Sequence, residues 1–217
     1  MKALKKDIDG LIRDALVYHA HILNLDETEI IDGTLSSETI IKTTKFFRPE
    51  ILAKNYLHMK KKEEKMLNFV MLLRSADLSP QELTELQRLN FSIVNIVYTC
   101  KYIKDSTQPI AEMRETTIPF VQSFYQQFRL HAVKIYKRIF KLLEGEDAEV
   151  IFHDIFHLFR EIKHHDQVFF NSMTYEMSQN VLSEFTITSL LNTSRFMTSS
   201  MKSLMLAIKE FYMKEKK

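Results

Sequence analysis

Residues 91–110 read FSIVNIVYTCKYIKDSTQPI, and residues 185–204 read FTITSLLNTSRFMTSSMKSL. The two stretches align without a gap, 94 residues apart, and many aligned positions carry similar side chains. The identical pairs are Phe91 with Phe185, Ile93 with Ile187, Thr99 with Thr193, and Ser106 with Ser200. Each stretch follows two earlier segments of helical apolar spacing, so the alignment predicts that the chain is a tandem duplication.

Apolar spacing of three and four residues dominates the whole chain and predicts six long helices. They cover residues 2–24, a segment that ends near 75, and then 79–112, 117–144, 147–171 and 179–214. A polar linker, LDETEIIDGTLSSE, separates the first two helices at 25–38. Three glycines and four prolines in 217 residues leave little material for turns, which argues against an all-β fold. The prediction is an all-α protein of two tandem antiparallel three-helix bundles, at residues 1–113 and 114–217.

Several helix ends carry their own local signals. Ser79, Pro80 and Glu82 form an N-cap, a first-turn proline and a capping-box acid. Pro119 marks another helix start, and Pro49 marks either a start or a kink. Gly145 is expected to end the fourth helix.

Composition excludes several classes of protein. The net charge is +2, from 30 basic and 28 acidic residues, so we expect no nucleic-acid partner. A single cysteine, Cys100, excludes an internal disulfide and is expected to be a core residue in a reducing compartment. The longest apolar runs, such as FVMLL, are much shorter than the ~20 residues of a membrane span.

A polar stripe follows one face of the third helix through Asn90, Val94, Val97, Lys101, Asp105 and Gln108. Lys101 and Asp105 are one turn apart, and Pro109 removes the hydrogen bond to the Asp105 carbonyl, so a kink is expected there. Arg195 and Ser199 occupy the matching positions of the second copy. Two interpretations stay open: a structural ion pair near a helix end, or a small polar or ion site between helices.

The run CKYIKDSTQPIAEM after LSPQELTELQRLNFSIVNIVY resembles the third helix of PhoU-like domains, in particular the cytoplasmic C-terminal domain of bacterial sodium/phosphate cotransporter-like proteins. The resemblance covers essentially the whole chain and implies two three-helix bundles side by side. It implies a non-enzymatic regulatory role in phosphate transport, in the cytoplasm at the inner face of the membrane. The implied partner is the membrane transporter portion of the same or another chain, with a homodimer as a further option.

This chain departs from the family at its metal site. PhoU proteins bind metal clusters through repeated E/D-x-x-x-D motifs on these helices, but Lys101 takes the place of the first acid, and Arg195 and Ser199 replace both acids in the second copy. Because a protonated lysine offers no lone pair, we expect no metal cofactor there. Phosphate near Lys101 and Arg195 fits better, although that expectation depends on the family alone.

Histidines in HDIFHLFREIKHH, residues 153–165, offer the other metal candidates: His153, His157 and His164. They lie nearly opposite the apolar face of their helix, so a solvent-facing stripe is predicted. The aromatic residues of the fourth helix, from Phe124 to Phe140, are expected to pack in the core. The alternative functions are a metal-dependent helical bundle, such as an oxidase, and a free-standing phosphate-uptake regulator.

Overall fold

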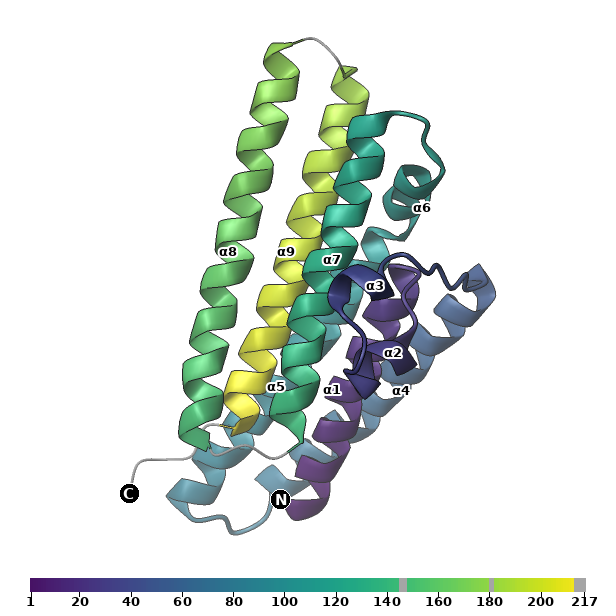
Figure 1. Ribbon diagram of the computed structural model, residues 1–217. Helices are drawn as coiled ribbons and strands as arrows, with labels where there is room; N and C mark the ends of the chain where they lie inside the picture. Colours follow the sequence, from purple (N-terminus) through teal and green to yellow (C-terminus); the bar gives the residue numbers. More distant parts are fainter. Residues whose placement is uncertain (145–147, 180–181, 213–217) are drawn as a thin grey trace.

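The structure is a computed structural model that describes residues 1–144, 148–179 and 182–212. Within these ranges it contains nine α-helices and no β-strand, which confirms the all-α prediction (Figure 1). The helices are α1 (Lys2–Ile22), α2 (Glu27–Asp32), α3 (Ser37–Ile40), α4 (Pro49–Arg74), α5 (Pro80–Asp105), α6 (Thr107–Glu115), α7 (Pro119–Leu143), α8 (Ala148–Ser178) and α9 (Glu184–Tyr212).

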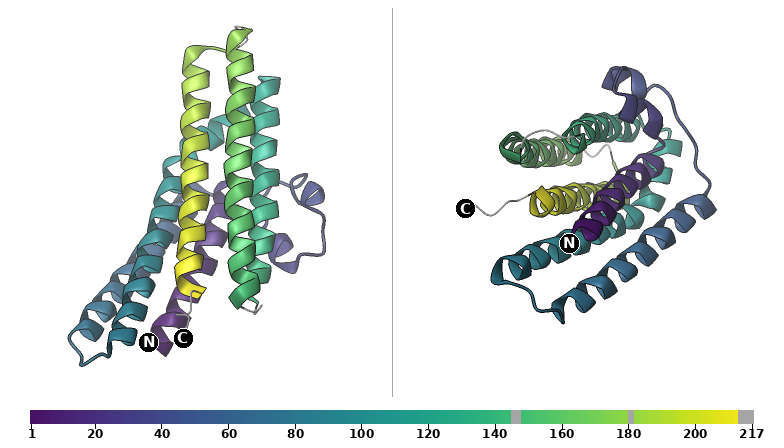
Figure 2. Two further views of the ribbon diagram at one scale, coloured as in Figure 1. Left: turned by 90° about the vertical axis from the view of Figure 1, so that its left-hand side faces the viewer. Right: turned by 90° about the horizontal axis from the view of Figure 1, so that it is seen from below.

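Six long helices form an elongated bundle, with α5 packed along α9, α8 along α9, and α4 against α1 and α5. Seen along the bundle, α7 and α8 form one layer, α1 and α9 the middle layer, and α4 and α5 the third (Figure 2, right). The middle layer is covered on both sides, whereas α4 lies at the edge of an outer layer. This arrangement leaves one side of α4 without a partner in the chain.

Several helix starts agree with their sequence signals. Ser79 and Glu82 form the expected capping box, with Pro80 in the first turn. Pro49 and Pro119 both begin helices, because a proline in the first turn gives up a hydrogen bond that the helix cannot form there anyway. Gly145, the expected end of the fourth helix, lies outside the described residues.

The third helix is interrupted near its end, one turn earlier than Pro109. Helix α5 ends at Asp105, and α6 starts at Thr107 after Ser106. The amide and the side chain of Ser106 both donate to the carbonyl of Ile103, at 3.2 and 2.9 Å, so Ser106 caps the end of α5. Pro109 is then in the first turn of α6, where it needs no N–H partner.

The polar linker predicted at 25–38 contains two short helices. Asp26 accepts a hydrogen bond from the Thr28 amide and caps α2, and Ser36 caps α3 in the same way through Thr39. Both helices pack on α7. We call residues 23–48 the strap, because they cross from the end of α1 over α7 to the start of α4 (Figure 1).

Two other boundaries differ from the prediction. Helix α8 continues to Ser178 instead of ending near 171, and α9 begins at Glu184 instead of 179. The NSMTYEMSQN segment, expected to be a break, is therefore mostly helical. Asn171, Ser172 and Thr174 in this segment are exposed, whereas Met173 is buried, so this part of α8 still has one side against the bundle.

The aromatic stripe of α7 lies in the core, as predicted. Its large side chains are all at most 5% exposed: Phe124, Tyr125, Phe128, Tyr136 and Phe140. The ring of Phe124 stacks on Phe169 of α8 at 3.8 Å between centroids. Cys100 is also buried, against Met59. These contacts join α7 to α8 and α4 to α5 without any polar group.

A buried polar cluster connects four long helices at the centre of the bundle. His19 of α1 lies between Tyr136 of α7, at 2.8 Å from Nδ1, and Ser200 of α9, at 3.0 Å from Nε2. The Ser200 hydroxyl donates to the Thr99 carbonyl at 2.8 Å, and the Thr99 hydroxyl donates to the Ser200 carbonyl at 3.1 Å. Since Ser200 gives its proton to Thr99, it must accept from His19, so His19 carries its proton on Nε2 and accepts from Tyr136.

The cluster is neutral and every side chain in it has a partner. Burial lowers the pKa of His19 to about 3, so the ring is uncharged at neutral pH. Ser92 also donates to the Ala207 carbonyl at 2.8 Å. The Ser92–Ala207 and Thr99–Ser200 bonds together show that α5 and α9 run antiparallel.

Arg129 of α7 holds the strap in place. Its side chain is fully buried and donates to the main-chain carbonyls of Leu23, Asn24, Ile41 and Thr43, at 2.6–3.1 Å. Leu23 is the C-cap of α1 and Ile41 is the C-cap of α3. A cation at the negative ends of two helices is favourable, because the helix dipoles and the free carbonyls both attract it.

Candidate interaction surface

The structure does not pair the residues of the predicted polar stripe. Lys101 and Asp105 are both exposed, and no ion pair joins them among the described side chains. The antiparallel register places Asp105 level with Ser194, next to Arg195, yet Arg195 is also exposed and Ser199 is half-buried. The expected ion pair is therefore not formed. Exposed charges are already solvated, so pairing would gain little.

The histidines of α8 face solvent, as predicted. His153, His157 and His164 are exposed, and the first two approach each other with Nε2 atoms 3.2 Å apart. Their neighbour His165 turns inward and stacks on His131 of α7, with ring centroids 3.8 Å apart. Burial lowers the pKa of His131 to about 3. No cluster of three or more histidine, cysteine or acidic side chains in the described ranges could hold a metal ion.

Helix α4 carries large apolar side chains on two sides. Its buried side chains, Leu52, Met59, Met66 and Val70, follow one stripe against the bundle. Ile51, in the first turn, is 44% exposed, and four further apolar side chains along the helix are exposed: Leu57 (59%), Phe69 (38%), Met71 (69%) and Leu72 (69%). At 100° per residue, Leu57, Met71 and Leu72 lie roughly opposite the buried stripe. We call these four residues the α4 apolar face.

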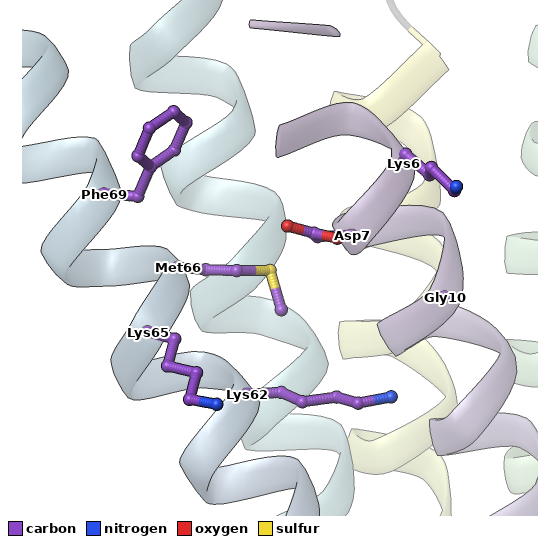
Figure 3. A pocket seen from close by; sticks show the side chains of 7 residues that line it. All are labelled: Lys6, Asp7, Gly10, Lys62, Lys65, Met66 and Phe69. Atoms are coloured by element: carbon purple, nitrogen blue, oxygen red, sulfur yellow. The ribbon is translucent and has the colours of Figure 1, made fainter. Parts of the chain in front are cut away.

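A groove of about 280 Å³ lies between α1 and α4, next to this face. Gly10 and Met66 line it, and Phe69 belongs to both the groove and the α4 apolar face. Lys62 reaches across from α4 towards α1, whereas Asp7 points into the groove from α1 (Figure 3). A methyl group at Gly10 would meet nothing within 4 Å, so the glycine keeps this wall of the groove open.

The rim of the groove is mainly basic. Lys6, Lys62 and Lys65 surround it with Asp7, and Lys62 also pairs with Asp14 of α1 at 2.5 Å. An apolar floor with a charged rim is typical of a surface that receives another helix, since apolar burial supplies affinity and the rim supplies orientation.

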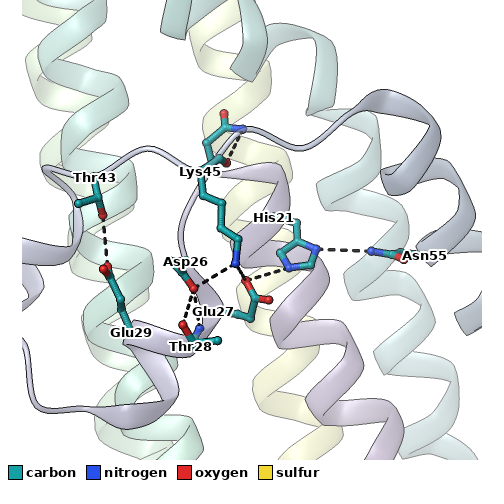
Figure 4. A network of polar contacts seen from close by, with 9 residues as sticks. His21, Asp26, Glu27, Thr28, Glu29, Thr43, Lys45 and Asn55 are labelled. Atoms are coloured by element: carbon teal, nitrogen blue, oxygen red, sulfur yellow. Dashed lines mark hydrogen bonds and ion pairs between the residues drawn. The ribbon is translucent and has the colours of Figure 1, made fainter.

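A polar network ties the strap to the N-terminal half of the bundle (Figure 4). Lys45 donates to Asp26 and to Glu27, each at 3.2 Å, and Glu27 lies 3.1 Å from His21 Nε2. The His21 ring also stacks on Phe47 at 3.8 Å. Burial is the main cause of the lowered pKa of His21, and the neighbouring Glu27 opposes it. The network holds both ends of the strap near the α1 C-terminus.

The sequence interpretation missed the polar residues that organise the interior. The sequence does contain a signal for Arg129, because this residue interrupts the apolar stripe of α7 between Tyr125 and Tyr136. A charged residue on such a stripe indicates either a partner in the core or an interface. His19 lies among apolar residues of α1 in the same manner. Both side chains form buried hydrogen bonds between elements of the bundle.

No helix in the described part of the chain is long and apolar enough to cross a membrane. No protein-family model matches the chain, and comparison with curated proteins and with solved structures gives no match.

Proposed function

We propose that this chain is a non-catalytic regulatory domain that acts through helix–helix contacts with a partner protein. The observation that supports it most directly is the α4 apolar face. Exposed apolar patches of this kind mark contact sites, because burying them in a complex removes apolar surface from water. The groove between α1 and α4 extends the same surface with lysines at its rim.

The proposed architecture is a tandem duplication, with one three-helix unit at residues 1–113 and another at 114–217. In this reading α1, α4 and α5 with α6 correspond to α7, α8 and α9. The repeated sequence in α5 and α9, and the antiparallel hydrogen bonds that join these helices, support the assignment. A pseudo-twofold axis would then pass between α5 and α9.

The proposed physiological context is phosphate transport, as the resemblance to PhoU-like domains implies. The partner would be the membrane transporter portion of the same or another chain, with the domain in the cytoplasm at the inner face of the membrane. Lys101 and Arg195 are exposed cations at matching positions of the two copies, so they are the proposed contacts for phosphate. Small shifts between packed helices would carry the signal.

The test is phosphate uptake in source cells that lack the gene. Cells complemented with the wild-type gene should restore the normal response of uptake to external phosphate. Cells complemented with the Leu72→Glu variant should not, because a carboxylate on the α4 apolar face would have to be desolvated in the complex. Leu72 is 69% exposed, so the variant should fold normally, which circular dichroism would check.

The matched control is Phe170→Glu on α8, which changes an apolar side chain of similar exposure on another helix. It should complement like the wild type. Unchanged phosphate uptake in the deletion strain would refute the transport context. Full complementation by Leu72→Glu would refute the α4 face as the contact surface.

A further inference from the structure

The surface of α8 places two imidazole nitrogens in a chelating arrangement. His153 and His157 are four residues apart, so their side chains lie one above the other on the same helical face. Their Nε2 atoms are 3.2 Å apart, and the ring centroids 4.4 Å. A tetrahedral zinc ion with Zn–N bonds of ~2.0–2.1 Å holds two ligating nitrogens about 3.3 Å apart. The separation of the two nitrogens therefore matches that of two ligands of one ion, and a change in ring orientation would aim both lone pairs at it.

The same two nitrogens can share a proton as a hydrogen bond, in which one ring carries it on Nε2. Metal binding needs the other tautomer in both rings, with the protons on Nδ1 and both Nε2 lone pairs free. Asp154 lies with Oδ1 3.9 Å from His153 Nδ1, on the side of the ring away from His157. At this distance the carboxylate is too far for a hydrogen bond, but its charge still attracts a proton on Nδ1 of His153.

The site is open to ions in solution. The His153 side chain is 73% exposed, and His157 is exposed as well. The charged groups near this face include Asp154, which attracts a cation, Arg160, which opposes it, and Glu161, which is already paired with Arg138 of α7. Imidazole is a borderline ligand that suits zinc, nickel and copper much better than magnesium or calcium.

We propose that His153 and His157 bind one divalent transition-metal ion of the zinc, nickel or copper class through their Nε2 atoms. The two histidines supply two ligands, and water or donors of another molecule take the remaining positions. The site is separate from the α4 apolar face and does not depend on the proposed function.

Calorimetric titration of the purified chain with zinc chloride at neutral pH tests the proposal. The wild type should bind one zinc ion per chain. His153→Gln and His157→Gln should each weaken binding by at least about tenfold, because a single imidazole remains. His164→Gln is the matched control: it removes an exposed histidine of the same helix and should leave the affinity unchanged.

Nuclear magnetic resonance gives a second readout. Substoichiometric Cu²⁺ should broaden the ring-proton signals of His153 and His157 before those of His164. All three variants change exposed side chains, so their circular dichroism should match that of the wild type. The proposal is overturned if the wild type does not bind zinc. It is also overturned if His164→Gln weakens zinc binding as much as the other two variants do, or if His153→Gln and His157→Gln both keep the wild-type affinity.

Discussion

Acid should destabilise this protein well above the pH at which its carboxylates take up protons. His19 and His131 are buried, and burial lowers the pKa of each to about 3, compared with an ordinary value of 6.5. Between these values the unfolded chain binds protons that the folded chain does not. The contribution of the two histidines to the free energy of unfolding is therefore fully present above about pH 6.5 and is lost as the pH falls towards 3.

The magnitude follows from the protons that the unfolded chain takes up. A histidine with an unfolded pKa of 6.5 binds almost one proton at about pH 5, which favours unfolding by about 2 kcal/mol relative to pH 8. The folded pKa of about 3 lies well below this window, so the folded state contributes almost nothing to the difference. His19 and His131 together should cost about 4 kcal/mol. His21 and His165, whose pKa values are also lowered by burial, add to the same slope.

Urea unfolding, followed by far-UV circular dichroism from about pH 8 to about pH 5, measures this loss directly. His19→Gln should lower stability at the high end, because it disturbs the Tyr136–His19–Ser200 chain of hydrogen bonds. It should also remove about 2 kcal/mol of the pH dependence. His131→Gln should independently remove a similar part of the pH dependence. A free energy of unfolding that stays constant over this range in the wild type would refute the reasoning, as would a slope that neither variant changes.

Two further predictions concern the strap and the start of α5. Arg129→Met should destabilise the fold by about 3–5 kcal/mol, since it removes four hydrogen bonds from a buried cation and leaves the Ile41 and Thr43 carbonyls without this donor. Limited proteolysis should then cut within residues 23–48, and unchanged protection would contradict the role of Arg129. Ser79→Ala should lower the free energy of unfolding by about 1 kcal/mol, because it removes the capping box at the start of α5. Urea unfolding measures this loss. The control is Ser75→Ala, in the exposed turn before α5, which should lower the free energy of unfolding by less.

Helix positions were predictable because their signals are local. The apolar period, the capping box at Ser79 and the first-turn prolines at Pro49, Pro80 and Pro119 each act within a few residues. The two strap helices were missed since each is at most six residues long and is held by contacts with α7. A period of 3.6 needs several turns before it can be recognised.

The burial of individual faces was harder to predict. Helix α5 has apolar residues on more than one side, and Phe91 and Tyr98 are both 49% exposed. The spacing of apolar residues therefore indicated a stripe through Val94, Val97 and Lys101. It did not show whether another helix covers that stripe. In the structure the valines are half-buried and Lys101 is exposed, so the stripe lies at the margin of the core.

The partners of buried polar residues were beyond sequence reasoning. Tyr136 and Ser200 are 117 and 181 residues from His19, and nothing local links them. The acceptors of Arg129 are mostly main-chain oxygens, which every residue possesses. An arginine that binds carbonyls leaves no acidic counterpart in the sequence to search for.

This choice of acceptors has an evolutionary consequence. Arg129 donates hydrogen bonds to main-chain oxygens of residues 23–43 and not to their side chains. Most substitutions in this segment would therefore preserve the four hydrogen bonds, provided that the backbone keeps its conformation. Related proteins could differ widely in the amino-acid sequence of this segment and still hold it in the same place. Insertions, deletions and prolines, by contrast, would displace the oxygens and should be tolerated poorly.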